Sequence, residues 1–269
     1  MNNCRSMGGD SKTPIEARLP IKGTLHLQIE YMQAFQELYQ GLSRKNRFVP
    51  SPPAQRLVDE LLEFARSHRS AKISRGSYFF RARINPTQTL TSPRPLTRTK
   101  MSAPPLDLAA AGRLNPEGIP YLYLASDSYT AVAEVRPWVG AQLTLARVKI
   151  DRNIEIIDFT NETPVGRPPE ARFPGSESGA ELIWRELLSY VMLMPLQPNH
   201  SVRYVPTQYF AEVLKANGFG GVKYKSSLNP KGFNLAIFNP LAGCVTSTRL
   251  VTVSGVTYTY KLAKQWPAR

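Results

Sequence analysis

Residues 112–125 read GRLNPEGIPYLYLA, and residues 130–137 follow with TAVAEVRP. The first stretch begins with turn-forming Gly and Pro residues and leads into a short apolar strand. The second is a short helical pattern that ends at Pro137. Two polar residues stand out: Tyr123 lies within an aliphatic strand, and Glu134 lies near a helix C-terminus, where the helix dipole disfavours a negative charge. This order of loop, strand and helix predicts the centre of the fold, with Glu134 as a candidate functional carboxylate.

Composition limits the class of protein. The chain has 269 residues, of which 42% are hydrophobic and 20% are charged, values typical of a globular protein with a substantial core. Its net charge of +14 favours an anionic ligand, which could be nucleic acid or a phosphate-bearing small molecule, or else an acidic protein partner. The alternative is a basic surface that is merely solvated.

The cellular compartment can also be inferred. Two cysteines, Cys4 and Cys244, do not make a disulfide framework, which favours a reducing compartment. Charged residues near the N-terminus occupy the positions where a signal peptide would be apolar. The most apolar window, residues 182–195, contains Arg185 and Glu186 and is too short to span a bilayer. We therefore expect a cytoplasmic protein without a membrane partner.

The rest of the sequence alternates irregularly between helical and strand patterns. Apolar residues at helical spacing predict helices over residues 25–42, 51–65, 181–194 and 207–216. Branched and aromatic runs predict strands over residues 78–84, 142–150, 154–159, 221–225 and 234–238, and a hairpin over residues 246–262. Residues 85–105 and 164–179 lack periodicity and are expected to be loops.

The irregular order favours an α+β fold, with a mixed β core and flanking helices, over a doubly wound sheet. We expect two parts, an N-terminal helical accessory region over residues 1–75 and an α+β domain over residues 76–269. The first 23 residues lack periodicity and are expected to be a loosely packed leader.

Several common chemistries lack their motifs. The three histidines are scattered without ligand spacing, so no metal site is predicted. Residues 218–221 read GFGG, which lacks the third glycine of a dinucleotide fingerprint and precedes a strand instead of following one. Residues 175–179 read GSESG, with Glu at the centre of a would-be nucleophile elbow. No Walker sequence occurs.

The remaining candidates are polar residues in apolar or loop settings: Arg81, Arg113, Tyr123, Glu134 and Ser226. Each has a structural explanation when it is taken alone. Arg81 could solubilise an edge strand, Tyr123 could be a core aromatic, and Ser226 could be a turn hydroxyl. Glu134 could pair with Arg81 or with Arg136. Their order in the chain is what favours a common site.

The pattern resembles the RES domain, a family named for a recurring Arg, Glu and Ser and found in bacterial toxins paired with Xre-type antitoxins. The resemblance rests on four segments and covers roughly residues 76–240: residues 80–83, 112–125, 131–136, and 221–227 with 234–238. It implies a fold like that of ADP-ribosyltransferases and an NAD⁺-consuming activity. The family roles would fall on Arg81, Tyr123, Glu134 and Ser226, with the neighbouring Ser227 as an alternative serine.

The chemistry of such a site follows from its substrate. Nicotinamide leaves NAD⁺ as a neutral molecule, so one carboxylate suffices where a glycosidase uses two. Glu134 would accept a hydrogen bond from the ribose 2′-hydroxyl and stabilise the oxocarbenium-like transition state. Tyr123 would stack on the pyridinium ring. Arg81, helped by Arg113, would hold the pyrophosphate, and Ser226 would bind the ribose or orient Glu134.

Three functions are compatible with these features. The first is a toxin that cleaves the nicotinamide–ribose bond of NAD⁺ as a glycohydrolase or phosphorylase and is paired with an Xre-type antitoxin. The second is an ADP-ribosyltransferase that modifies a protein or nucleic acid. The third is a non-enzymatic nucleic-acid-binding module, motivated by the basic clusters at residues 44–47 and 94–100. Nucleic acid is not expected as the primary partner, NAD⁺ is expected as a substrate, and a homo-oligomer is compatible with the sequence.

Overall fold

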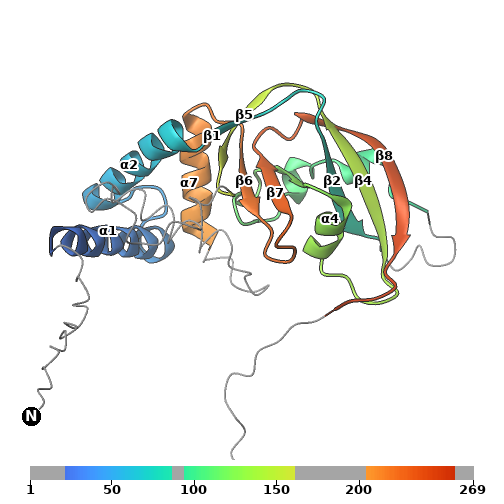
Figure 1. Ribbon diagram of the computed structural model, residues 1–269, viewed down its shortest axis with the longest axis horizontal. Coiled ribbons are helices and arrows are strands. Elements are labelled where there is room, and N and C mark those ends of the chain that lie inside the picture. Colours follow the sequence, from blue (N-terminus) through green and yellow to red (C-terminus); the bar gives the residue numbers. More distant parts are fainter. Residues whose placement is uncertain (1–21, 87–93, 161–203, 258–269) are drawn as a thin grey trace, which may run out of the picture.

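A computed structural model describes residues 22–86, 94–160 and 204–257 of the chain. These residues form a mixed sheet of eight strands with helices packed around it (Figure 1). The expected α+β class is therefore confirmed. None of the described helices combines the length and the apolarity needed to cross a membrane.

The elements have the following bounds. The helices are α1 (Lys22–Gln40), α2 (Pro52–His68), α3 (Arg98–Met101), α4 (Ser128–Glu134) and α7 (Val205–Ala216), with a π-helical turn at Gly41–Lys45 and a 3₁₀ turn at Leu106–Leu108. The strands are β1 (Ser70–Ile73), β2 (Tyr78–Ile84), β3 (Leu122–Ala125), β4 (Gln142–Ile150), β5 (Ile154–Asp158), β6 (Gly221–Lys225), β7 (Phe233–Ile237) and β8 (Gly243–Thr252).

The sheet is divided into two halves. The strand order is β1-β5-β6-β7-β3-β2-β4-β8, and all neighbours are antiparallel except β5 and β6. β2 pairs with β4 along its whole length, but it pairs with β3 at a single position, Phe80 opposite Ala125. From Arg81 onward, the edge of β2 that faces β3 is therefore open. This gap is the feature that positions the candidate site.

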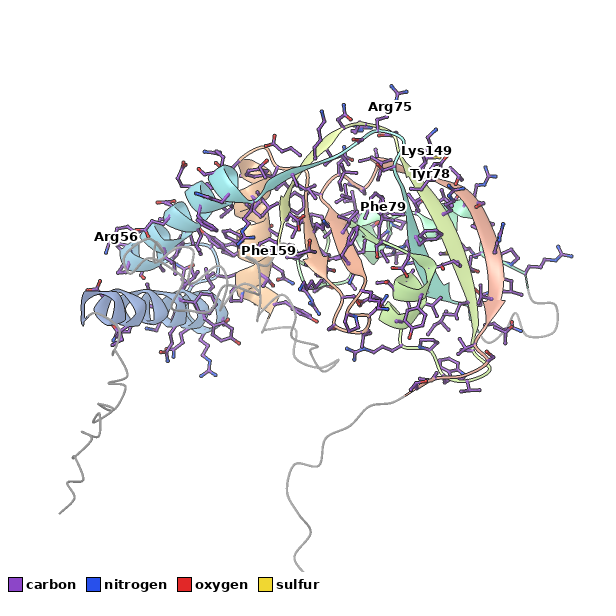
Figure 2. All side chains as sticks on the ribbon, viewed as in Figure 1. Arg56, Arg75, Tyr78, Phe79, Lys149 and Phe159 are labelled. Atoms are coloured by element: carbon purple, nitrogen blue, oxygen red, sulfur yellow. The ribbon has the colours of Figure 1, made fainter. Side chains whose placement is uncertain are left out.

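The helices cover different parts of the sheet. α1, α2 and α7 lie together beside β1, β5 and β6, whereas α4 packs against β2, β3 and β4 (Figure 1). Two N-terminal helix residues, Leu57 and Val58, belong to the same buried cluster as Ile157 and Val222 of the sheet. Phe159 belongs to this cluster too and lies where the sheet meets the helices (Figure 2).

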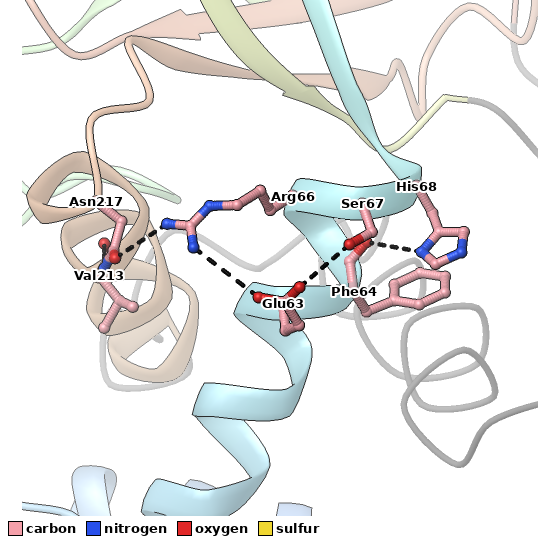
Figure 3. A network of polar contacts seen from close by, with 7 residues as sticks. All are labelled: Glu63, Phe64, Arg66, Ser67, His68, Val213 and Asn217. Atoms are coloured by element: carbon pink, nitrogen blue, oxygen red, sulfur yellow. Dashed lines mark hydrogen bonds and ion pairs between the residues drawn. The ribbon is translucent and has the colours of Figure 1, made fainter.

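Polar contacts also join α2 to α7 (Figure 3). Near the end of α2, Arg66 donates from Nη2 to Asn217 Oδ1 at 3.4 Å and forms an ion pair with Glu63 at 3.9 Å. Asn217 in turn donates to the carbonyl of Val213 at 2.9 Å. β1 precedes residue 76 and pairs with β5, so the N-terminal segment contributes a strand to the sheet as well as helices. The two-part division at residue 76 stays a prediction.

The strand bounds predicted for residues 78–84, 142–150 and 221–225 are confirmed. The unstructured segment predicted for residues 85–105 is wrong in part, because α3 forms there, with Thr97 Oγ1 accepting from the Lys100 N–H. A single helical turn is too short to produce a periodic signal.

Strand β1 was not expected, and β8 is longer than the predicted first strand of the C-terminal hairpin. β8 pairs with β4 from Gly243 to Thr252. Pairing with this distant strand therefore makes β8 begin before residue 246, where the predicted hairpin starts. The second strand of the predicted hairpin lies mostly outside the described residues. So do the predicted leader, the loop over residues 164–179 and the helix over residues 181–194.

Candidate active site

A cavity of about 290 Å³ lies where β2 and β3 separate. Its lining comes from β2, β3, β6, β7 and the end of α4, and therefore from both halves of the sheet. The lining residues are Phe80, Arg81, Ala82, Tyr123, Leu124, Ala125, Ala131, Glu134, Val135, Tyr224 and Asn234. Three of them, Arg81, Tyr123 and Glu134, are among the residues predicted from the sequence.

Glu134 is the last residue of α4, and one of its carboxylate oxygens is fixed by two donors. Ser226 Oγ and Asn234 Nδ2 both donate to Glu134 Oε1, each at 2.7 Å. Ser226 Oγ also accepts from the N–H groups of Leu228 and Asn229, at 3.2 and 3.1 Å. Because these donors occupy its lone pairs, the Ser226 hydroxyl proton is directed at Glu134. Within the described part of the chain, Glu134 Oε2 has no hydrogen-bond partner and Glu134 forms no ion pair.

A polar network joins the loop after β6 to the start of α4. Asp127 caps α4 by accepting from the Thr130 N–H at 2.8 Å, and it also accepts from Thr130 Oγ1 at 2.6 Å. Thr130 Oγ1 accepts in turn from Asn229 Nδ2 at 2.8 Å. A Cβ at Gly232 would overlap the Thr130 hydroxyl, so glycine is required for this close approach. The network holds Ser226 in reach of Glu134.

Burial alone would raise the pKa of the Asp127 carboxyl, but its hydrogen bonds from Ser126 and Thr130 lower that pKa below its usual value. Asp127 is therefore ionised at neutral pH and acts as an acceptor only. This fixes the direction of the hydrogen bonds along the network.

Tyr123 lines the cavity, and its hydroxyl lies against the preceding loop. The hydroxyl donates to Asn115 Oδ1 at 2.8 Å and accepts from the Leu114 N–H at 3.2 Å. Burial raises the pKa of Tyr123, so the hydroxyl stays neutral. A Cβ at Gly112 would overlap Asn115 Oδ1 and lie 3.0 Å from the Tyr123 hydroxyl, which explains the glycine that opens the GRLN sequence.

Arg81 bridges the gap between the two halves of the sheet. Its Nη1 donates to the carbonyl oxygen of Tyr123 at 2.9 Å. Burial, and then the positive charge of Arg83, lower the pKa of Arg81 to about 10, so it remains a cation at neutral pH. Its Nε–H is buried and has no acceptor in the described residues. A buried donor without a partner is costly, and an anionic ligand would relieve that cost.

The structure does not put Arg113 among the residues that line the cavity. The Arg113 guanidinium lies over the ring of Tyr224, with Cζ 5.5 Å from the ring centroid. Burial raises the pKa of Tyr224, although the positive charge of Arg113 opposes that rise. Arg113 therefore borders the site through Tyr224, and its carbonyl accepts from Thr207 Oγ1 at 2.5 Å.

The structure brings Arg81, Tyr123, Glu134 and Ser226 together, Ser226 through its bond to Glu134. Ser227 is exposed and forms no hydrogen bond with described residues, so Ser226 is the serine that joins the site. Asn234 was missed as a functional residue, although a polar amide within an apolar strand is a signal of the kind that singled out Tyr123. Phe80 and Tyr224 were also missed, because their aromatic side chains are equally typical of a core.

No curated protein matches the chain. A chain from the crystal structure of the M. tuberculosis MbcT-MbcA toxin-antitoxin complex matches with a TM-score of 0.43 and 13% sequence identity, covering 73% of this chain and 94% of that chain. The model of the RES domain family matches residues 83–260, more than half of the sequence. The chain therefore belongs to the RES domain family.

Proposed function

We propose that this protein cleaves the nicotinamide–ribose bond of NAD⁺, by hydrolysis or phosphorolysis, as the toxin of a toxin–antitoxin pair. The observation that carries the proposal is the state of the Glu134 carboxylate. Ser226 and Asn234 hold Oε1 of Glu134, which lines the cavity, and Oε2 has no hydrogen-bond partner among the described residues. A fixed carboxylate with one unoccupied oxygen can accept a hydroxyl group of a ribose.

The reaction needs no general acid. The C1′–N bond breaks with its electron pair on nicotinamide, which leaves as a neutral molecule, and positive charge develops on the ribose. Glu134 Oε2 accepts the 2′-hydroxyl proton in a hydrogen bond that strengthens as this charge develops. Water or phosphate then attacks C1′ from the face opposite the leaving group or from the same face, and water loses a proton to solvent.

Other groups at the cavity support a dinucleotide substrate. Three aromatic residues, Phe80, Tyr123 and Tyr224, line it, and an aromatic face is favourable for a pyridinium cation. Arg81 lines the same cavity, and its buried Nε–H lacks an acceptor among the described residues. A pyrophosphate oxygen would provide that acceptor, so we assign the pyrophosphate to Arg81.

The partner is proposed from the family and from charge. Membership of the RES family supports an Xre-type antitoxin, and the net charge of +14 favours an acidic protein surface as its contact. Mixing the toxin with an Xre-type protein encoded beside it tests this assignment: a complex that resists physiological salt would support it, whereas two separate species in size-exclusion chromatography would contradict it.

The reaction is tested by product analysis. Purified protein is incubated with NAD⁺ carrying a label in its adenylate half, with and without phosphate, and in the presence of a cell lysate. Nicotinamide release with free labelled ADP-ribose, or with a phosphorylated ADP-ribose when phosphate is present, is the expected result. Label attached to protein or nucleic acid would instead identify a transferase, and absence of nicotinamide release would contradict NAD⁺ cleavage.

A further inference from the structure

A second cavity adjoins the first along the open edge of β2. It has a volume of about 540 Å³ and shares Val135 with the cavity that contains Glu134. Its lining residues are Arg83, Ile84, Pro86, Leu96, Lys100 and Val135. We call it the distal cavity.

The two cavities follow each other in sequence as well as in space. Residues 80–82 line the first cavity, and residues 83, 84 and 86 line the distal one. A strand rises about 3.3 Å per residue, so Phe80 and Ile84 are about 13 Å apart along the edge. Because β3 leaves this edge unpaired beyond Phe80, an extended ligand can follow it from one cavity into the other.

The lining becomes more positive along this path. Among the described residues, the first cavity is lined by one carboxylate, Glu134, and one cation, Arg81, whereas the distal cavity is lined by two cations, Arg83 and Lys100, and by no acidic residue. Arg83 Nη1 donates to the Lys100 carbonyl at 2.6 Å, which ties α3 to β2 and fixes the wall of the cavity. The Lys100 side chain is exposed, and its ammonium group has no hydrogen-bond or ion-pair partner in the described residues.

We propose that the distal cavity binds the adenosine-phosphate half of the dinucleotide. The apolar side chains Ile84, Pro86 and Leu96 provide a surface for the base, and the Lys100 ammonium provides a counter-charge for a phosphate. The polarity of the path matches the ligand, whose pyridinium end is cationic and whose pyrophosphate is anionic. This assignment rests on the proposed NAD⁺ cleavage, and it makes the distal cavity the part of the site that distinguishes a dinucleotide from a mononucleotide.

Binding of ADP-ribose tests the proposal without requiring a reaction. Calorimetric titrations with ADP-ribose are compared for the full chain, for Lys100→Glu and for the matched control Lys72→Glu. Lys72 is exposed on β1, at the opposite end of the strand order, so both variants change the net charge equally. We expect Lys100→Glu to weaken ADP-ribose binding about tenfold and to leave the unfolding temperature unchanged, with Lys72→Glu equal to wild type.

Kinetics with a truncated substrate give a second readout. Nicotinamide mononucleotide lacks the adenylate half, so Lys100→Glu should lower kcat/KM for NAD⁺ about tenfold without changing kcat/KM for the mononucleotide. Equal ADP-ribose affinity in Lys100→Glu and wild type would overturn the distal site, even if NAD⁺ cleavage is observed. Conversely, Lys100-dependent ADP-ribose binding without nicotinamide release would support the distal site and contradict the proposed reaction.

Discussion

Ser226 Oγ lies 2.7 Å from Glu134 Oε1, although 92 residues separate them in the chain. The contact joins the loop after β6 to the last residue of α4. It forms because the network of Asp127, Thr130 and Asn229 ties that loop to the first turn of the same helix. The helix α4 has seven residues and contacts this loop at both ends. Its first turn holds the loop in place, and its last residue, Glu134, is the carboxylate that the loop orients.

Asn234→Asp is expected to change the pH dependence of turnover. A carboxylate in place of the amide would lie against Glu134, and two adjacent carboxylates share a proton. The acid limb of the pH–kcat profile should therefore move up by about one pH unit or more. The matched control is Asn239→Asp, since Asn239 is an exposed turn residue whose Oδ1 already acts as an acceptor. Superimposable profiles for Asn234→Asp and wild type would contradict the role given to Asn234.

Two substitutions at Tyr123 separate its ring from its hydroxyl. Tyr123→Phe removes the donor to Asn115 and should destabilise the protein by about 1–2 kcal/mol while retaining nicotinamide release. Tyr123→Ala also removes the ring from the cavity and should lower kcat/KM at least about tenfold further. Urea unfolding and initial rates measure the two effects. If Tyr123→Phe were as inactive as Tyr123→Ala while remaining folded, the hydroxyl would have a chemical role that the structure does not give it.

Gly112→Ala is expected to disturb the loop that carries Asn115. The added methyl group would overlap Asn115 Oδ1, which accepts the Tyr123 hydroxyl, so we expect a loss of about 2 kcal/mol in the free energy of unfolding. Gly41→Ala is the matched control, because a Cβ at Gly41 meets no atom within 4 Å. Thermal unfolding of both variants should show a loss for Gly112→Ala only. An equal unfolding temperature for the two would contradict the tight packing at Gly112.

Asp158→Ala tests a buried ion pair away from the cavity. Asp158 is 3% exposed and lies 2.8 Å from Lys223 Nζ, so removing it should cost about 3 kcal/mol and leave kcat unchanged. Burial alone would raise the pKa of Asp158, but hydrogen bonds from Lys223 and Thr160 outweigh it and lower that pKa below 3.8.

Because the folded-state pKa of Asp158 is depressed, the stabilisation is complete above pH 3.8 and is lost as the pH falls through the folded-state value. The stability difference between wild type and Asp158→Ala should therefore shrink in acid. Urea unfolding at neutral pH and near pH 3, which lies below the unperturbed pKa of 3.8, measures this difference. A difference that stays constant across this range would contradict an ionised Asp158 as its source.

Local sequence patterns were sufficient to predict most of the described helices and strands. The strand Tyr78–Ile84 and the helix that begins after Ser51 carry their own signals, in branched and aromatic content and in prolines of the first turn. β1 carries no such signal, because a strand of four residues at the edge of a sheet is stabilised by its partner β5 and not by its own sequence. The order of the strands is likewise set by pairings between distant segments.

The site was predictable in its members but not in its geometry. Arg81, Tyr123 and Glu134 were identified because each is polar in an apolar setting and their order resembles that of the RES domain. The separation of β2 from β3 after Phe80, which creates the cavity, depends on where two distant strands stop pairing. The amide of Asn234 reaches Glu134, which is 100 residues away in the chain, for a similar reason, because β7 pairs with the distant strand β3.

In the proposed reaction, the Glu134 carboxylate stabilises the transition state for cleavage of NAD⁺. Glu134→Gln retains the size of the side chain and an acceptor oxygen but removes the charge, and Glu134 is exposed, so the variant should fold like wild type. The direct measurement is the initial rate of nicotinamide release at saturating NAD⁺. We expect the rate for Glu134→Gln to fall at least about 100-fold with an unchanged unfolding temperature. Undiminished release by the folded variant would contradict this role of Glu134.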